Sequence, residues 1–131
     1  MTANATKLTP WLRLVRPPNL PTVPGDPLAG FVLASGAGGA ADLALLWAAL
    51  STTALYAAGL VLNDVADSDV DRRERPARPL PSGAVPRNAA LLTGLLLGAA
   101  WIAVSFLANV ITILIASGLF FLILVYDFRT P

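Results

Sequence analysis

The sequence predicts an all-α protein: a bundle of about four transmembrane helices preceded by a short helix at the membrane interface. Its composition is the first reason, because 56% hydrophobic and 13% charged residues are too apolar a mixture for a soluble domain of 131 residues. Apolar stretches long enough to cross a bilayer are the second reason. The third is that all nine basic residues fall on one side of the resulting bundle. We therefore expect residues 1–131 to form a single membrane domain.

The N-terminal segment indicates the interfacial helix. Residues 1–7 are polar and without pattern, and we expect them to be a flexible lead. Thr9 can cap a helix whose first residue is Pro10, after which apolar residues starting with Trp11 alternate with arginines. Such a helix lies in the membrane interface, with the tryptophan at headgroup level and the arginines reaching water.

The next run, residues 17–27, contains five prolines, which argue against regular helix there. Asp26 and Pro27 can begin a helix as its N-cap and first residue, but the apolar stretch that follows spans only about half a bilayer. The first span is therefore predicted over residues 20–37, with a break near Pro24. Irregular backbone at this depth either lines a cavity or is a simple proline kink, and Asp26 favours the cavity.

The other spans are predicted over continuous apolar stretches: residues 43–62, 88–107 and 110–126. Small residues at 36–41 form a turn, and Asp42 then caps the second span. The basic, proline-rich stretch 72–87 reads as a loop, and Asn109 marks a tight turn before the last span.

The basic residues orient this bundle. They lie before the first span, between the second and third spans, or after the fourth: Lys7, Arg13, Arg16, Arg72, Arg73, Arg75, Arg78, Arg87 and Arg129. By the positive-inside rule, the N-terminus, the loop after the second span and the C-terminus are cytoplasmic. We expect a multi-pass protein of the cell inner or plasma membrane.

An acidic motif, N-D-V-A-D-S-D-V-D, follows the second span directly. Wound as a helix, it carries an amide and three carboxylates within about one third of its circumference: Asn63, Asp64, Asp67 and Asp71. Asp69 falls on the other side. Acids crowded at a helix C-terminus repel one another and the helix dipole, and a bound hard cation such as Mg²⁺ would offset both penalties. The plainer alternative is a solvated, charge-rich loop.

The residue types available narrow the chemistry. The chain has no cysteine and no histidine, which excludes thiol nucleophiles, imidazole bases and the common zinc sites. Carboxylates holding a cation beside arginines are suited to a diphosphate, with the guanidinium groups taking the remaining charge. Such a site favours allylic C–O ionisation in a lipid-embedded cavity, although most arginines of such a loop serve as topology determinants. Nothing here supports nucleic-acid binding.

These residues resemble the UbiA-type intramembrane prenyltransferases. The acidic motif matches that family's N-D-x-x-D-x-x-x-D signature, and an R-P-x-R-P-L-P-S-G stretch follows it, here from Arg75 to Gly83. The pair Arg16-Pro17 and the nearby Asn19 are similar to the start of the family's first membrane helix. Three landmarks thus occur in the family's order.

The resemblance implies Mg²⁺-dependent transfer of a prenyl chain from an isoprenoid diphosphate to an acceptor, commonly an aromatic one. It implies that Asn63, Asp67 and Asp71 are the metal and diphosphate ligands on which catalysis depends, with Asp64 as a supporting acid. It also implies that the diphosphate is contacted by a further set of residues: Arg16, Asn19, Arg72 and Arg78.

The chain departs from the family in length. Members usually have about nine spans in two similar halves, and the second half supplies another Asp-rich motif for a second metal. Here the only acid after Glu74 is Asp127, which is reached too early to count as that motif. The first interpretation is therefore the N-terminal half of a prenyltransferase that needs the missing half, from a longer product or from a partner chain.

Two alternatives belong to other classes. A non-catalytic membrane protein or assembly subunit could retain the cation and diphosphate-lipid site. A CDP-alcohol phosphotransferase also places aspartates at the end of a membrane helix, but it needs a D-G-x-x-A-R element that is absent here.

Overall fold

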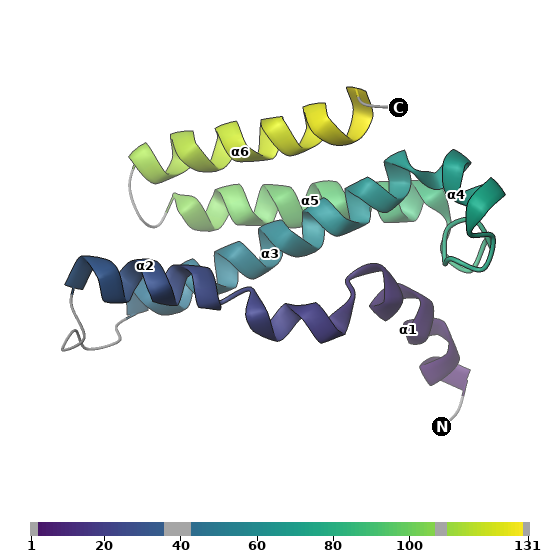
Figure 1. Ribbon diagram of the computed structural model, residues 1–131, viewed down its shortest axis with the longest axis horizontal. Coiled ribbons are helices and arrows are strands. Elements are labelled where there is room, and N and C mark those ends of the chain that lie inside the picture. The colour runs from purple at the N-terminus through teal and green to yellow at the C-terminus, as the bar shows by residue number, and fades with distance from the viewer. Residues whose placement is uncertain (1–2, 36–42, 107–109, 130–131) are drawn as a thin grey trace.

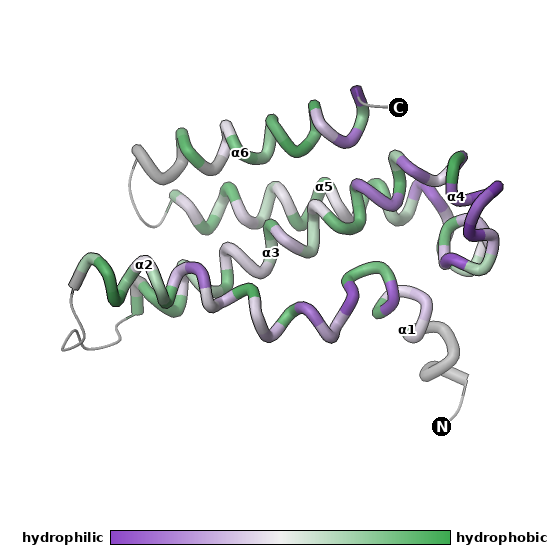
Figure 2. Tube along the Cα trace, in the orientation of Figure 1, coloured by the Kyte–Doolittle hydropathy of each residue, from purple (hydrophilic) through white to green (hydrophobic). Residues whose placement is uncertain are grey.

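The computed structural model describes residues 3–35, 43–106 and 110–129, and the regular elements within them are all helical (Figure 1). In chain order they are α1 (Ala3–Leu14), the 3-10 helix η1 (Pro17–Thr22), α2 (Gly25–Ser35), α3 (Leu43–Ala66), α4 (Ser68–Glu74), α5 (Arg87–Ser105) and α6 (Val110–Arg129). Hydrophobic residues cover most of α3, α5 and α6, whereas hydrophilic residues gather at the end of the bundle where α4 lies (Figure 2). The prediction of an all-α fold is confirmed.

Two helices of the described chain are long and apolar enough to cross a membrane: Leu45–Ala66 and Arg87–Ser105. They correspond to the second and third predicted spans. The first predicted span is divided between η1 and α2, which confirms a break near Pro24. A count of four spans remains a prediction.

The two long helices pack closely because α5 presents small residues to its neighbours. A Cβ atom at Gly94 would lie 2.7 Å from Cγ of Leu62, and one at Gly98 would meet the ring of Phe120. The glycines therefore let α5 approach α3 and α6 more closely than any side chain would allow.

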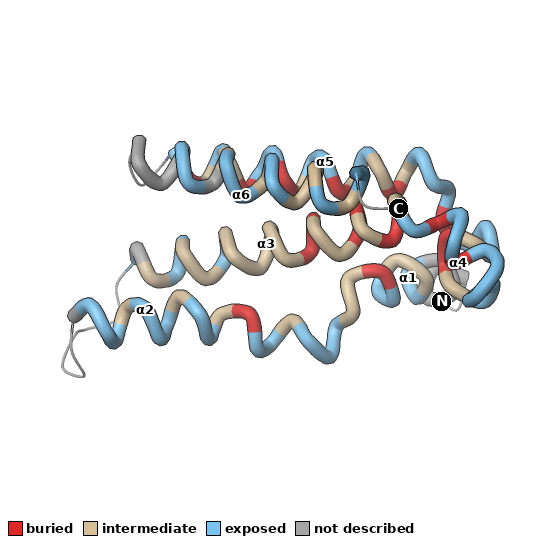
Figure 3. The backbone as a smooth tube through the Cα atoms, turned by 45° about the horizontal axis from the view of Figure 1, so that its top comes forward, coloured by how far each residue is buried: buried red, intermediate tan, exposed pale blue. Residues whose placement is uncertain are grey.

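The core lies toward the α4 end of the bundle, where the buried residues of the second half of α3 are found (Figure 3). It joins α1, α3, α5 and the loop before α5 through six buried side chains: Leu14, Val61, Val65, Leu80, Val85 and Ala90. Trp11 of α1 packs against this cluster, so that α1 is fixed to the same end of the bundle.

Several predicted boundaries near the N-terminus are wrong. The helix begins at Ala3 rather than after Thr9, and Pro10 lies inside it, because alanines and a lysine upstream of the proline are good helix formers. The 3-10 helix η1 forms in the proline run that we expected to be irregular. Its prolines fit because their φ suits a 3-10 turn, whose first residues need no N–H donor.

Helix α2 also begins before its predicted N-cap. The Leu28 N–H donates to the Pro24 carbonyl oxygen over 3.2 Å, so Asp26 lies in the first helical turn. The predicted turn at 36–41, its cap Asp42 and the turn at Asn109 lie outside the described residues.

The sequence predicts the acidic motif as one continuous helix, and the structure shows that it is not. Helix α3 ends at Ala66, Asp67 forms a turn, and α4 begins at Ser68. Because acids in the first turn of α4 and arginines in its last turn complement the helix dipole, the predicted loop starts at Arg75 instead of Arg72.

The last two helices differ by a few residues from their predictions. Helix α5 begins at Arg87 instead of Asn88. Helix α6 continues past Tyr126 to Arg129, a basic residue in the last turn, where the dipole favours it.

Candidate functional site

The acidic motif keeps its helical spacing across the turn at Asp67. The Asp67 N–H donates to the Asn63 carbonyl over 2.9 Å, and the Asp71 N–H donates to the Asp67 carbonyl over 2.8 Å. One-turn spacing is therefore preserved although the helix is interrupted.

The structure divides the four predicted metal ligands into two pairs. The amide Nδ2 of Asn63 donates to Oδ2 of Asp67 over 2.9 Å. Asp64 and Asp71 are buried, 5% and 4% exposed, and both face Arg78. Nη1 of Arg78 lies 2.5 Å from Oδ2 of Asp71 and 3.5 Å from Oδ1 of Asp64. Within the described chain no group of three or more acids is close enough to hold a metal alone.

Arginines balance the buried acids. Nη2 of Arg16 lies 3.4 Å from Oδ1 of Asp64, which therefore has two guanidinium partners. Nη1 of Arg75 lies 3.9 Å from Oδ1 of Asp71. Arg16 lies between α1 and η1, and its backbone is in the left-handed conformation, with φ 48°.

Two of the predicted diphosphate contacts, Arg72 and Asn19, lie away from the buried acids. Arg72 is 3.9 Å from Asp69, and both side chains are largely exposed. Asn19 is exposed on η1, where its carbonyl accepts a 2.7 Å bond from the Thr22 hydroxyl. Neither residue lines the cavity described next.

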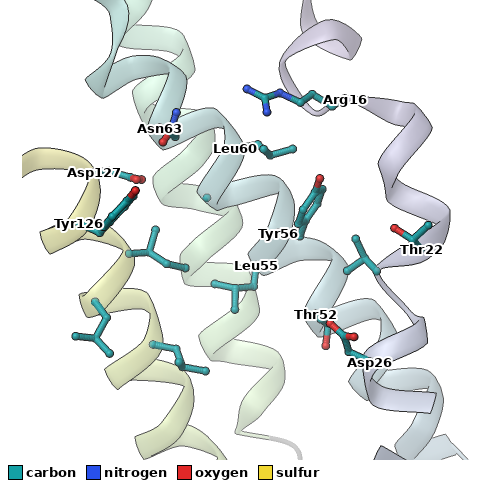
Figure 4. A pocket seen from close by; sticks show the side chains of 15 residues that line it. Arg16, Thr22, Asp26, Thr52, Leu55, Tyr56, Leu60, Asn63, Tyr126 and Asp127 are labelled. Carbon is teal, nitrogen blue, oxygen red and sulfur yellow. The ribbon is translucent and has the colours of Figure 1, made fainter. Parts of the chain in front are cut away.

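A central cavity of about 900 Å³ lies between α3, α6 and the η1–α2 segment (Figure 4). Its wall is mainly aliphatic, with Leu55 and Leu60 of α3 facing Leu119, Leu122 and Ile123 of α6. One end is polar and contains Arg16, Asn63, Tyr126 and Asp127; Thr22, Asp26, Thr52 and Tyr56 line the remainder. The cavity therefore combines an aliphatic wall with a polar cluster at each end: Arg16, Asn63 and Asp127 at one, and Thr22, Asp26 and Thr52 at the other.

Asp127 is the residue that our sequence interpretation set aside. Figure 4 shows it at the polar end of the central cavity, on α6 opposite Asn63. Its Oδ2 atom is buried and has no hydrogen-bond partner among the described residues. Asp127 lies one residue beyond the predicted fourth span; burial raises the pKa of its carboxyl, and nearby Asp67 raises it further. The predicted topology could have found it, because it puts residue 127 on the same side as the acidic motif.

The donor set at the polar end suits a hard cation. Asn63 and Asp127 line this end, and Asp67, which does not line the cavity, is bonded to Asn63 and borders a smaller pocket together with Asp127. These residues offer amide and carboxylate oxygens, and the buried Oδ2 of Asp127 is an atom that a cation would satisfy. Because these donors alone do not form a closed site, substrate oxygens and water would have to complete the shell. This arrangement is the one in which Mg²⁺ is commonly bound beside a phosphate group.

Comparison with known proteins bears on the family and the fold of this chain. The profile of the UbiA prenyltransferase family matches residues 27–130. A digeranylgeranylglyceryl phosphate synthase of Thermococcus sibiricus is 38% identical over 68 residues, which are 52% of this chain and 24% of that protein. One from Methanoculleus marisnigri is 30% identical over 119 residues, 91% of this chain and 42% of that protein.

A solved structure from work on a digeranylgeranylglyceryl phosphate synthase in membranes superposes with a TM-score of 0.85 at 27% identity. The match covers 94% of this chain and 44% of that one. The aligned region thus spans less than half the length of each relative. Together these matches indicate an integral membrane protein with an all-α fold.

Proposed function

Because this chain belongs to the UbiA prenyltransferase family, we propose that it takes part in Mg²⁺-dependent transfer of a prenyl group from an isoprenoid diphosphate to a small acceptor within the membrane. The observation that carries the proposal is the central cavity. Its aliphatic wall suits an isoprenoid chain, and its polar end brings Arg16, Asn63 and Asp127 together. A diphosphate joined to an apolar chain has the same division of character.

In this reaction the allylic C–O bond breaks, and the diphosphate leaves with the electron pair. The acceptor then forms a bond to the same carbon and loses a proton. The aliphatic residues of α3 and α6 would hold the chain and keep water from the carbocation. Arg16 would bind diphosphate oxygens through its guanidinium group. Mg²⁺, when bound, would neutralise the leaving group and so favour ionisation.

The predicted ligands need an exchange of partners to act together. Asp64 and Asp71 each hold Arg78 through one carboxylate oxygen, so a cation must compete with that guanidinium for both acids. Binding of a cation with a diphosphate would offer each acid a new positive partner and Arg78 a new negative one. Each charged group keeps a partner of opposite charge in this exchange. The exchange therefore explains how the two acids and Arg78 can all belong to the site. In the same proposal, Asn19 and Arg72 would reach the diphosphate only by moving.

The acceptor and the complete enzyme are parts of this proposal. The relatives' names describe a glyceryl phosphate product, whereas the motif resemblance favours an aromatic acceptor, so we keep both classes. Since the aligned region is less than half of each relative, we propose that turnover needs a second half, either from a longer product or from a partner chain. The alternative is a non-catalytic membrane protein that retains the diphosphate-lipid site.

The test is Mg²⁺-dependent binding of geranyl diphosphate to the purified chain in detergent, measured by calorimetry. Asp67→Asn should abolish the Mg²⁺-dependent part of binding, because it removes the carboxylate charge that lies beside Asn63. Asp69→Asn removes the same charge from an exposed carboxylate and is the matched control; it should bind as the parent does. Unchanged affinity in Asp67→Asn would contradict the proposed site.

A further inference from the structure

The end of the central cavity away from Arg16 carries a second polar cluster, which we call the distal cluster: Thr22, Asp26 and Thr52. Figure 4 shows Asp26 beside Thr52, and Tyr56 between them and Arg16. Asp26 belongs to α2 and Thr52 to α3, and these two helices pack against each other. The proposed chemistry takes place at the opposite end of the cavity, so it leaves the distal cluster without a role.

The distal cluster lies at membrane depth. Thr52 is at least seven residues, or about 10 Å, from either end of Leu45–Ala66, the part of α3 that is long enough to cross a membrane. Asp26 has no ion pair and no side-chain hydrogen bond with the residues that the structure describes. Acids at this depth are costly, and they commonly act as counter-ions of a ligand or mark its path. A ligand that enters the cavity would supply the partner that this acid needs.

The members of the distal cluster offer hydrogen-bond acceptors. The Thr52 hydroxyl donates its proton to the Ala48 carbonyl over 2.8 Å, and the Thr22 hydroxyl donates its proton to the Asn19 carbonyl over 2.7 Å. Because a hydroxyl has a single proton, each threonine oxygen is left as an acceptor only. An ionised carboxylate is also an acceptor only. The cluster therefore selects a ligand group that donates hydrogen bonds.

A primary ammonium group matches the distal cluster. It has three N–H donors and no acceptor, and the cluster has three acceptor side chains, one of which carries the opposite charge. Asp26 is exposed within the described chain, so a ligand can reach it. An ion pair away from bulk water is favourable only when the remaining donors are also bonded, and the two threonine oxygens provide those bonds. A hydroxyl group has one donor and would leave two acceptors unused.

The distance between the two ends of the cavity separates this ammonium group from the reacting atoms. Thr52 and Asn63 are eleven residues apart on α3, which is about 16 Å at 1.5 Å per residue. Reacting atoms must come within about 3.5 Å of each other. The allylic carbon stays near the diphosphate, so a molecule bound at Asp26 has to reach it with another part of its structure. The aliphatic wall and Tyr56 line the space between the two ends.

We propose that the distal cluster binds the primary ammonium group of a small amphiphilic amine, and that this amine is the prenyl acceptor. Asp26 is the counter-ion of the ammonium group, and the oxygens of Thr22 and Thr52 accept its remaining N–H donors. The bound ammonium group holds the acceptor with its uncharged, nucleophilic end toward the allylic carbon. The identification of the amine as the acceptor rests on the proposed function, whereas the binding site itself does not.

The experiment compares the binding of tyramine with that of 4-ethylphenol, which has the same skeleton without the amino group. Both are titrated into the full chain in detergent, with EDTA present and without diphosphate, so that the distal cluster is tested alone. Ligand-observed NMR reports both affinities. The parent should bind tyramine at least tenfold more tightly than 4-ethylphenol, the difference expected for one charged hydrogen-bonding group.

Two matched pairs of variants test the residues. Asp26→Asn should weaken tyramine binding at least tenfold and leave 4-ethylphenol binding unchanged. Asp69→Asn makes the same change at an exposed position outside the cavity and should bind tyramine as the parent does. Thr52→Val should weaken tyramine binding about fivefold, the loss expected for one neutral hydrogen bond. Thr53→Val removes the same kind of 2.8 Å bond to a backbone carbonyl outside the cavity and should have no effect.

Three results would overturn the proposal. Equal affinity of the parent for the two compounds would mean that the amino group is not recognised. Equal weakening by Asp26→Asn and Asp69→Asn would mean general attraction of a cation to the acidic protein surface. Equal binding by Thr52→Val and Thr53→Val would exclude the threonine oxygen as an acceptor.

Two further measurements keep the outcome unambiguous. Thermal unfolding in detergent shows whether Asp26→Asn is folded, and the comparison of Thr52→Val with Thr53→Val tests the site by itself if it is not. The titration with geranyl diphosphate and Mg²⁺ tests the proposed function separately. If tyramine binds as expected and geranyl diphosphate does not bind, the amine site stands and the proposed function fails.

Discussion

Asn63 and Asp67 are joined by a 2.9 Å hydrogen bond across the turn where α3 ends. The bond uses the amide nitrogen of Asn63 and one carboxylate oxygen of Asp67. It leaves the amide oxygen and the second carboxylate oxygen unused by the pair, on a segment that borders the central cavity. The hydrogen bond thus fixes the orientation of the Asn63 amide oxygen and of the second Asp67 carboxylate oxygen. Mg²⁺ binds in octahedral geometry and therefore needs ligand oxygens with fixed directions.

Asn63→Leu should therefore weaken Mg²⁺-dependent binding of geranyl diphosphate at least tenfold. The stability should fall by only about 1 kcal/mol, because the bond is exposed. Thr53→Val is the matched control: it removes a 2.8 Å hydrogen bond to Ala49 on the same helix, away from the cavity. Calorimetry reports affinity, and thermal unfolding in detergent reports stability. Equal binding by the two variants would contradict a ligand role for Asn63.

Arg78→Gln should destabilise the protein by about 2–4 kcal/mol, because it leaves Asp64 and Asp71 buried without their shared partner. Arg72→Gln should cost less than about 1 kcal/mol, since its pair with Asp69 is exposed. Thermal unfolding in detergent measures both.

The same pairing permits a rescue experiment. Adding Asp64→Asn and Asp71→Asn to Arg78→Gln removes the uncompensated charges and should recover most of the lost stability. If the triple variant were no more stable than Arg78→Gln, the loss would not come from buried charge.

Gly98→Ala should destabilise the packing of α5 against α6, because the added methyl group overlaps the Phe120 ring. A loss of about 1–3 kcal/mol is expected for overpacking of this kind. Gly118→Ala on α6 meets no atom within 4 Å and should be neutral or slightly stabilising. Comparison of the two thermal transitions tests whether α5 and α6 are in contact as described.

Asp127→Asn should stabilise the Mg²⁺-free protein at pH 7. The carboxyl has a raised pKa in the folded state, so folding favours its protonated form. The raised pKa of Asp127 adds to the free energy of unfolding fully when the pH is below the pKa of the unfolded state. That contribution is lost as the pH rises through the pKa of the folded state. The variant's advantage should therefore be less than about 1 kcal/mol at pH 7, since the carboxyl is partly hydrated, and should disappear in acid. An advantage independent of pH would exclude this cause.

The absence of cysteine allows a direct test of the predicted topology. Ser82→Cys, in the loop before α5, should react with a membrane-impermeant maleimide only from the cytoplasmic face. Gly38→Cys, in the predicted turn after the first span, should react only from the opposite face. Labelling of both positions from one side would show that the second span does not cross the membrane completely.

Much of this fold could be predicted because the length of an apolar run and the position of a proline each determine the structure of their own segment. The long apolar runs became α3 and α5, and the break near Pro24 lies where a missing N–H donor interrupts a helix. The boundaries at Ala66 and Arg75 could not be predicted from helical periodicity. The turn at Asp67 preserves the same one-turn spacing as a continuous helix, so both give one pattern in the sequence.

The site was only partly predictable for a different reason. Spacing along one segment placed Asn63, Asp64, Asp67 and Asp71 near one another, but it could not show that Arg78 occupies the space between two of them. Asp127 and Arg16 reach the same cavity from opposite ends of the chain. Contacts of that kind depend on how helices pack, and a single sequence contains no record of them.

The backbone at Arg16 has a consequence for how this protein can be altered. A residue with a side chain is held in the left-handed region at roughly 1–2 kcal/mol, a cost that glycine would not incur. Glycine at this position would relax the chain between α1 and η1, but it would also remove the guanidinium that lies 3.4 Å from the buried Asp64 and borders the central cavity. The strain at position 16 is therefore tied to the charge balance of the acidic motif. A variant that relieves this strain is expected to gain no stability, because it loses a partner of a buried acid, and to bind a diphosphate less well.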